Sequence, residues 1–126
     1  MSTHILVVED EPSLALLWHH TLYRMGYTVT LAGSVRAAVA VGRQVPVHLI
    51  LVDYYLPDGY GTEILAELRD GNRPYSVLIT SDPYLKLDNH ADAPLVDRHL
   101  VKPVRVKTMA NTILDLLNPS RRPTSA

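Results

Sequence analysis

The chain has 126 residues, which is the length of one domain. Apolar residues make up 47% and charged residues 20% of the composition, which excludes a disordered chain, a coiled coil and a collagen-like repeat. The net charge of −1 argues against a nucleic-acid-binding domain, because such domains are usually strongly basic. We expect no membrane span and no signal peptide, and the absence of cysteine excludes a disulfide framework and a thiolate metal site.

Short apolar runs alternate with amphipathic segments along the whole chain. The runs are rich in β-branched residues and predict five buried strands, at residues 4–8, 28–32, 47–52, 76–80 and 98–101. The segments that follow each strand predict five helices, at residues 12–25, 35–42, 62–71, 83–89 and 106–117. Continuous apolar strands joined by helices indicate an α/β fold, a parallel sheet with helices on both faces.

Turn-forming residues set the expected boundaries of these elements. Gly26 and Gly42 are placed to end the first two helices. Residues 54–61 predict a loop, because they contain one proline and two glycines. Residues 1–118 are therefore expected to form one domain, and residues 119–126 a tail or the start of a linker.

Polar residues follow the predicted strands at their carboxyl ends, where ligands bind in an open parallel sheet. Glu9 and Asp10 come after the first strand and Asp53 after the third. Thr80 closes the fourth strand, and Lys102 follows the fifth. We expect these side chains, which come from distant parts of the sequence, to meet at one edge of the sheet.

Three carboxylates at one point repel one another unless a cation joins them. Oxygen ligands in the absence of thiols favour Mg²⁺, so Glu9, Asp10 and Asp53 are predicted to hold this ion. A phosphoryl group would fill the remaining place, since a carboxylate can attack phosphorus to form an aspartyl phosphate. Thr80 would then donate a hydrogen bond to a transferring oxygen, and Lys102 would neutralise its charge.

In this order and spacing, four pieces of the sequence resemble the response-regulator receiver domain of bacterial two-component signalling. The pieces are VVEDEP at 7–12, DYYLPDGYG at 53–61, ITS at 79–81 and VKP at 101–103. The resemblance covers residues 4–117. It implies a doubly wound, flavodoxin-like fold whose five-stranded parallel sheet has the strand order 2-1-3-4-5, and a cytoplasmic signalling protein.

The resemblance implies a role for each acidic position. Asp53 is expected to accept the phosphoryl group from a phosphohistidine on a sensor histidine kinase or a phosphotransfer protein. Asp10 is expected to bind Mg²⁺ directly, and Glu9 directly or through water. Asp53 and the backbone carbonyl of Tyr55 complete the implied set of metal ligands.

Three further positions concern the response to phosphorylation. Thr80 is expected to follow the phosphoryl group, and Lys102 to form an ion pair with it. The bond between Lys102 and Pro103 is typically cis in the family. The family's switch aromatic falls at His99 in this chain, which leaves two interpretations open: a pH-sensitive switch, or a plain edge-strand histidine.

The resemblance also implies where partners bind. An effector domain or protein is expected on the face formed by the family's fourth helix, fifth strand and fifth helix. In the fourth helix, Tyr84, Leu85 and Leu87 either belong to this partner surface or cover the core. We expect no membrane contact and no direct nucleic-acid binding by this domain, and homodimer formation stays open.

The predicted function is a phosphorylation-activated signalling switch rather than a metabolic enzyme. One alternative is a receiver-like interaction module that needs no phosphate, because His99 and the irregular segment 83–97 depart from the family pattern. A phosphohydrolase of the haloacid dehalogenase type is disfavoured. Such enzymes use a second aspartate two residues after the nucleophile, where this chain has Tyr55.

Overall fold

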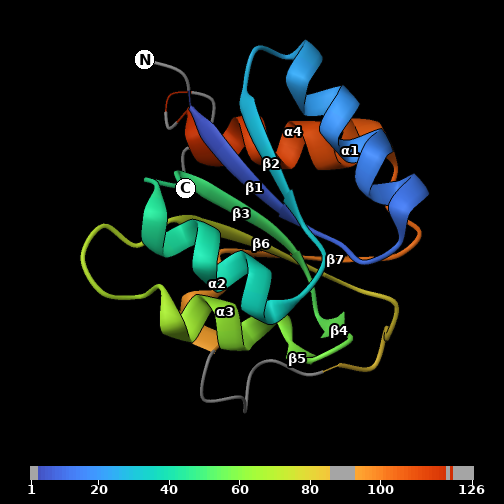
Figure 1. The fold of residues 1–126 in the computed structure, drawn as a ribbon. Helices are drawn as coiled ribbons and strands as arrows, with labels where there is room; N and C mark the ends of the chain where they lie inside the picture. Colours follow the sequence, from blue (N-terminus) through green and yellow to red (C-terminus); the bar gives the residue numbers. More distant parts are fainter. Residues whose placement is uncertain (1–2, 86–92, 119, 121–126) are drawn as a thin grey trace, which may run out of the picture.

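The computed structural model describes residues 3–85, 93–118 and 120, which form a five-stranded parallel sheet, a short hairpin and the covering helices (Figure 1). The sheet has the spatial order β2-β1-β3-β6-β7. Its strands are β1 (His4–Val8), β2 (Thr28–Ala32), β3 (Leu49–Asp53), β6 (Tyr75–Thr80) and β7 (Arg98–Val101). Numbered within the sheet, this is the order 2-1-3-4-5, so the predicted doubly wound flavodoxin-like fold is confirmed.

Helices cover both faces of this sheet. The described helices are α1 (Pro12–Arg24), α2 (Val35–Gln44), α3 (Gly61–Glu67), α4 (Val106–Leu117) and the 3₁₀ helix η1 (Ala93–Leu95). In Figure 1, α1 and α4 lie on one face of the sheet, and α2 and α3 lie on the other. A further helix was predicted over residues 83–89; residues 83–85 are not helical, and 86–89 lie outside the described part of the chain.

Alternating side chains of the strands fill two hydrophobic cores. Successive residues of a strand point to opposite faces of a sheet. On β1, Ile5 and Val7 pack in the core beneath α1 and α4, whereas Leu6 and Val8 pack in the core beneath α2 and α3. Burial of each such side chain stabilises the fold by roughly 1.5–3 kcal/mol. The central strands are therefore apolar on both faces, as their sequences predicted.

The ends of α1 follow from local chemistry. The Glu11 carboxylate accepts hydrogen bonds from the backbone N–H groups of Ser13 (3.1 Å) and Leu14 (2.7 Å), so it caps the helix start. Gly26 has a φ of +96°, in the left-handed region that favours glycine. The predicted helix end before Gly26 is confirmed.

The second helix runs past the glycine that was expected to end it. α2 continues through Gly42 to Gln44, so that prediction is wrong. A Cβ atom at Gly42 would overlap the side chain of Leu68, which follows α3. Gly42 is therefore a point of close approach between α2 and the end of α3 rather than a helix terminator.

Several other boundaries also differ from the sequence prediction, most of them by one residue. β3 begins at Leu49 rather than at residue 47. Just before it, the His48 N–H donates to the His4 carbonyl and the His48 ring accepts the His4 N–H, each at 2.9 Å. α3 ends at Glu67, and Gly71 lies in the following turn with a φ of +76°. The expected loop at 54–61 contains two short paired strands, β4 (Tyr55–Leu56) and β5 (Gly59–Tyr60).

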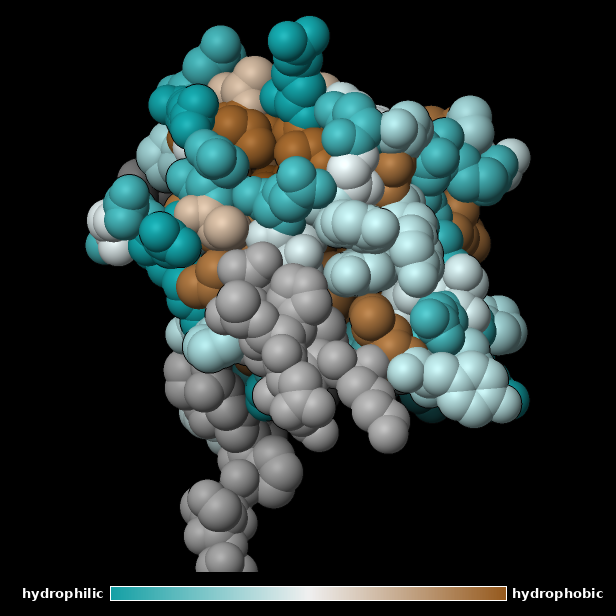
Figure 2. Space-filling view, turned by 90° about the horizontal axis from the view of Figure 1, so that it is seen from below, coloured by the Kyte–Doolittle hydropathy of each residue, from teal (hydrophilic) through white to brown (hydrophobic). Residues whose placement is uncertain are grey.

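Hydrophobic and hydrophilic residues are interspersed on the surface of the described part of the chain. Figure 2 views the molecule from below, and the hydrophobic residues on the described part of this face form small patches between hydrophilic ones. The exposed large apolar residues of the described chain include Leu16 and Tyr23 on α1. Among the described helices, none combines the length and the apolar character needed to cross a membrane.

A polar network joins the segment before β7 to the start of β6. The guanidinium of Arg73 donates to both carboxylate oxygens of Asp97, at 3.0 and 3.3 Å, and to the Leu95 carbonyl at 3.0 Å. The backbone N–H of Ser76 donates to the same Asp97 carboxylate at 2.8 Å. The Asp97 carboxylate thus accepts hydrogen bonds both from the backbone at the start of β6 and from the Arg73 guanidinium.

Replacement of Asp97 tests this network. Asp97→Ala removes the carboxylate that accepts from Arg73 and from the Ser76 N–H, so the free energy of unfolding should fall by about 1–3 kcal/mol. Urea denaturation followed by circular dichroism measures the change. Asp70→Ala, an exposed carboxylate in the nearby loop, is the matched control and should change it by less than about 0.5 kcal/mol. Equal losses in the two variants would contradict the assigned role.

Candidate functional site

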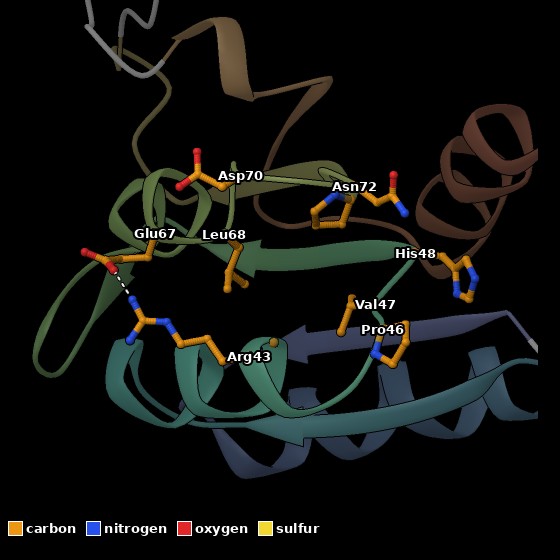
Figure 3. Close-up of a pocket in the computed structure, with 10 residues that line it drawn as sticks. Arg43, Pro46, Val47, His48, Glu67, Leu68, Asp70 and Asn72 are labelled. Carbon is orange, nitrogen blue, oxygen red and sulfur yellow. Dashed lines mark hydrogen bonds and ion pairs between the residues drawn. The ribbon is translucent and has the colours of Figure 1, made fainter.

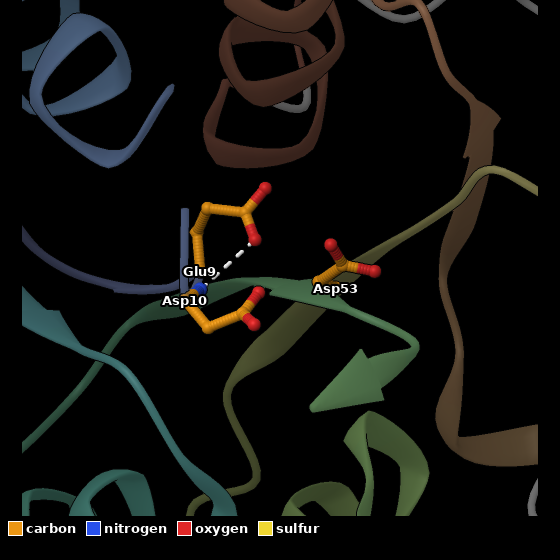
Figure 4. A group of neighbouring side chains, drawn as sticks. All are labelled: Glu9, Asp10 and Asp53. Carbon is orange, nitrogen blue, oxygen red and sulfur yellow. Dashed lines mark hydrogen bonds between the residues drawn. The ribbon is translucent and has the colours of Figure 1, made fainter. Parts of the chain in front are cut away.

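The sheet topology brings three carboxylates together at its carboxyl edge. Glu9 and Asp10 directly follow β1, and Asp53 is the last residue of β3, the neighbour of β1 in the sheet. One oxygen of each side chain lies within 4.8 Å of the others. In Figure 4 the three carboxylates face a shared space, and the Asp10 N–H donates to Glu9 at 2.9 Å.

Burial makes this cluster electrostatically costly. Glu9 is 4% exposed and Asp53 is 5% exposed, whereas Asp10 is exposed to solvent. Ionised carboxylates that leave water need compensating charge or hydrogen bonds. The cluster therefore depends on a cationic partner.

Lys102 supplies that partner from the far end of the chain. Its Nζ lies 2.7 Å from Glu9 Oε1 and 2.5 Å from Asp53 Oδ2. The Lys102 backbone N–H donates to the Thr80 carbonyl at 2.7 Å, which continues the β6–β7 ladder and fixes where the side chain starts. The bond between Lys102 and Pro103 is cis. One ammonium group thus bridges the two buried carboxylates.

The charge balance shifts two pKa values. Burial raises the pKa of Glu9 to about 7, and the adjacent Asp53 adds to this rise while Lys102 opposes it. Burial alone would lower the pKa of Lys102, but hydrogen bonds to Asp53 and Glu9 outweigh it and raise the pKa. Three carboxylates face a single ammonium group, and a further cation would relieve the remaining repulsion. Oxygen donors of this kind fit Mg²⁺.

Thr80 lies at the same edge of the sheet. It is fully buried at the end of β6, and its hydroxyl oxygen accepts a hydrogen bond from the Asp82 N–H at 3.1 Å. β6 pairs with β3, and Asp53 is in register with Ile79, the residue before Thr80. Because the hydroxyl acts as acceptor toward Asp82, its proton is free to be donated elsewhere.

The hairpin after Asp53 was not predicted, although its turn has a sequence signal. Tyr55 pairs with Tyr60 and Leu56 with Gly59, so the turn consists of Pro57 and Asp58, and proline followed by Asp and Gly is a frequent turn sequence. The rings of Tyr54, Tyr55 and Tyr60 contact one another, with centroids 4.9–6.0 Å apart. The Tyr55 N–H donates to Asp53 Oδ1 at 3.3 Å, so the hairpin begins beside the acidic cluster.

The fold and the sequence together identify the family. The profile of the response regulator receiver domain matches residues 5–114, which is most of the chain. The chain belongs to the response regulator receiver domain family. Its predicted identity as a receiver domain is therefore confirmed.

Curated relatives of this receiver domain are transcriptional regulators. The TorCAD operon transcriptional regulatory protein TorR of Escherichia coli O157:H7 is 33% identical over 118 residues, which cover 86% of this chain and 50% of TorR. The DNA-binding response regulator MtrA of Mycolicibacterium smegmatis is 30% identical over 120 residues, which cover 88% of this chain and 53% of MtrA. The probable transcriptional regulatory protein TcrX of Mycobacterium tuberculosis is 36% identical over 75 residues, which cover 60% of this chain and 32% of TcrX. The chain thus spans about half the length of TorR and MtrA.

Solved structures agree with the fold. A CheY-like receiver domain protein from Methanospirillum hungatei JF-1 has a TM-score of 0.84 at 24% identity and covers 94% of this chain and 96% of its own. The response regulator TrrA from Thermotoga maritima, solved in complex with Mg²⁺ and BeF, has a TM-score of 0.79 at 23% identity. This match covers 90% of the present chain and 98% of the TrrA chain.

The receiver domain has a cavity at the opposite edge of the sheet. It measures about 510 Å³ and lies between α2, α3 and the segments that lead into β3 and β6 (Figure 3). Leu68 and Val47 line its apolar part, and the Arg43–Glu67 ion pair lies at its rim. The predicted site residues lie at the carboxyl ends of the strands, so the acidic cluster does not use this cavity.

His99, which the sequence predicted at the position of the family's switch aromatic, lies on β7. Its Nε2 is buried and has no hydrogen-bond partner among the described residues, and burial lowers the pKa of the ring. Of the residues expected to form the partner surface or to cover the core, Tyr84 is 85% exposed, whereas Leu85 packs against the core beneath α2 and α3. Leu87 lies outside the described residues. The two described residues of the predicted partner surface therefore have different environments.

The environment of His99 predicts a pH dependence of stability. A histidine whose pKa is lowered by folding binds more protons in the unfolded chain, so acidification below its ordinary value of 6.5 favours unfolding. The wild type should lose stability relative to His99→Phe as the pH falls from 7 to about 5. Urea denaturation at a series of pH values measures the difference, and the other histidines are common to both proteins. Parallel stability curves would contradict the prediction.

Proposed function

We propose that this receiver domain is a phosphorylation-activated switch in which Asp53 accepts a phosphoryl group from a phosphohistidine. One observation carries the proposal: Asp53 is nearly buried beside Glu9 and Asp10, and it faces the ammonium group of Lys102. A structural surface carboxylate has no need of such partners. Phosphoryl transfer, by contrast, requires positioned charge around the transferring oxygens.

The chain's own residues supply each requirement of the transfer. An oxygen of the Asp53 carboxylate attacks phosphorus, the P–N bond of the phosphohistidine breaks, and its electron pair stays on the imidazole nitrogen. Lys102 exchanges its contact with the Asp53 carboxylate for one with the phosphoryl oxygens. Thr80 donates its hydroxyl proton to the same group. Because Thr80 is the last residue of β6, this movement couples phosphorylation to the end of that strand.

Glu9, Asp10, Asp53 and the backbone carbonyl of Tyr55 are the groups that we propose hold Mg²⁺. When bound, this ion would neutralise negative charge on the transferring phosphoryl oxygens. The excess of carboxylates over cationic groups supports this assignment, because it leaves the site with uncompensated negative charge.

The proposed partners follow from the family. A sensor histidine kinase or a phosphotransfer protein delivers the phosphoryl group, and an effector domain or protein binds the face that includes β7 and α4. Residues 1–118 form the switch, and 119–126 are a tail or the start of a linker. TorR and MtrA extend well beyond the matched region, which supports an output carried by another domain or protein rather than by this one.

The direct test is the intact mass of the chain after incubation with Mg²⁺ and acetyl phosphate. The wild type should gain one phosphoryl adduct, and Asp53→Ala should gain none. Asp70→Ala, a distant carboxylate variant, should be modified like the wild type. A stable adduct on Asp53→Ala, or no adduct on the wild type even with a competent kinase, would refute the proposal.

Removal of Lys102 tests the coupling between phosphorylation and conformation. Lys102→Ala removes the charge that follows the phosphoryl group, so modification should no longer shift the amide resonances of Thr80 and β7 in NMR spectra. Lys107→Ala, on the exposed side of α4, should respond as the wild type does. Lys102→Arg keeps the charge and separates loss of coupling from loss of stability. An unaltered response in Lys102→Ala would contradict the assigned role.

An interaction module that needs no phosphate is the alternative, and His99 at the switch position favours it. The two functions differ in what the partner detects. If Asp53→Ala binds the partner as tightly as the wild type does under phosphorylating conditions, the alternative holds. If binding requires an intact Asp53, the switch holds.

A further inference from the structure

A carboxylate at the tip of the β4–β5 hairpin holds the start of a neighbouring helix. Asp58 accepts the backbone N–H of Val35 at 2.7 Å through Oδ1 and the N–H of Arg36 at 3.0 Å through Oδ2. These are the first two residues of α2, whose N–H groups have no partner within the helix. The hydrogen bonds from Arg36 and Val35 hold the pKa of Asp58 below its usual value. Asp58 therefore caps a helix that begins 23 residues earlier in the sequence.

The same hairpin contains part of the proposed metal site. Its base is fixed by backbone bonds, because the Tyr54 N–H donates to the Ile79 carbonyl and the Gly61 N–H donates to the Tyr54 carbonyl, each at 2.7 Å. Tyr55, whose carbonyl is a proposed Mg²⁺ ligand, lies between this base and the tip. The Tyr60 N–H in β5 donates to Glu63 of α3, and at the tip Asp58 ties the hairpin to α2, so Asp58 limits how far the tip can move away from α2.

The helix that Asp58 holds is tied to the other ligand segment. α2 begins just after β2, and Ala32 at the end of β2 accepts the Glu9 N–H at 3.0 Å. A short path thus runs from Glu9 through Ala32 and the start of α2 to Asp58, and from there to Tyr55. Figure 1 shows the hairpin beside the end of α2 that follows β2.

We propose that Asp58 is a positioning residue for the metal site, because it locks the hairpin that carries Tyr55 to the segment that carries Glu9 and Asp10. This inference rests on the proposed function of the acidic cluster. Asp58 does not contact the cluster; it sets the distance between the two chain segments that supply its ligands. Outer residues that orient metal ligands typically change metal affinity 10–100-fold when they are replaced.

The test compares two caps of the same helix. Asp58→Ala removes the cap that joins α2 to the hairpin, whereas Ser34→Ala removes a cap within the α2 segment, since Ser34 Oγ accepts the Ala37 N–H at 3.1 Å. Mg²⁺ is titrated into the purified chain and binding is followed by NMR. Asp58→Ala should raise the Kd for Mg²⁺ by about tenfold, and Asp58→Asn, which keeps one acceptor oxygen, by less. Ser34→Ala should keep the wild-type Kd although it weakens the same helix.

Amide hydrogen exchange without Mg²⁺ gives an independent measure. Exchange at the Tyr55 and Tyr60 N–H groups should be faster in Asp58→Ala than in either Ser34→Ala or the wild type. Equal Mg²⁺ affinity in Asp58→Ala and the wild type would overturn the inference while leaving the proposed function intact. Equal loss of affinity in Asp58→Ala and Ser34→Ala would also overturn it, because helix stability alone would then be responsible. No Mg²⁺ binding by the wild type would overturn the proposed metal site itself.

Discussion

The ammonium group of Lys102 between two buried carboxylates is the interaction on which the site depends. Glu9 and Asp53 are packed side by side in a region with little solvent, and the repulsion between them would favour protonation or local unfolding if they were unpaired. Burial, with a smaller contribution from Asp53, raises the pKa of Glu9 to about 7 even with Lys102 in contact, so the ammonium group only partly offsets the cost of ionising Glu9 at this place. Three carboxylates and one ammonium group therefore lie at the carboxyl edge of the sheet. The proposed Mg²⁺ ion would supply the positive charge that this group of side chains lacks.

The parallel topology is what makes this arrangement possible. Each crossover helix returns the chain to the amino end of the sheet, so all five strands end at the same edge. The strands and the position of the site could be predicted from the sequence. Apolar runs indicate the strands, and the polar residues that follow them indicate the carboxyl edge of the sheet. Helix ends were less predictable. Gly42 has the local signal of a terminator, yet it lies inside α2, where Leu68 leaves no room for a Cβ atom, and one chain segment alone does not reveal such an approach.

The site shows the same division between local and long-range information. Glu9, Asp53 and Lys102 could be placed together from their positions at strand ends, and the resemblance to receiver domains gave each an expected role. The cap that Asp58 places on α2 could not be foreseen, because it joins residues 23 positions apart through side-chain geometry. At His99 the sequence left two interpretations open. His99 lies on the edge strand β7 with its Nε2 buried and without a partner among the described residues, and both interpretations stay predictions.

The central claim, that the acidic cluster carries excess negative charge which a cation relieves, is tested most directly by thermal unfolding with and without Mg²⁺. The account predicts that Mg²⁺ stabilises the wild type in proportion to RT ln(1 + [Mg²⁺]/Kd). It also predicts that Asp53→Asn, which removes one of the crowded charges, is at least as stable as the wild type without Mg²⁺ and gains little when the ion is added. A wild type whose unfolding is indifferent to Mg²⁺, together with a less stable Asp53→Asn, would contradict the account.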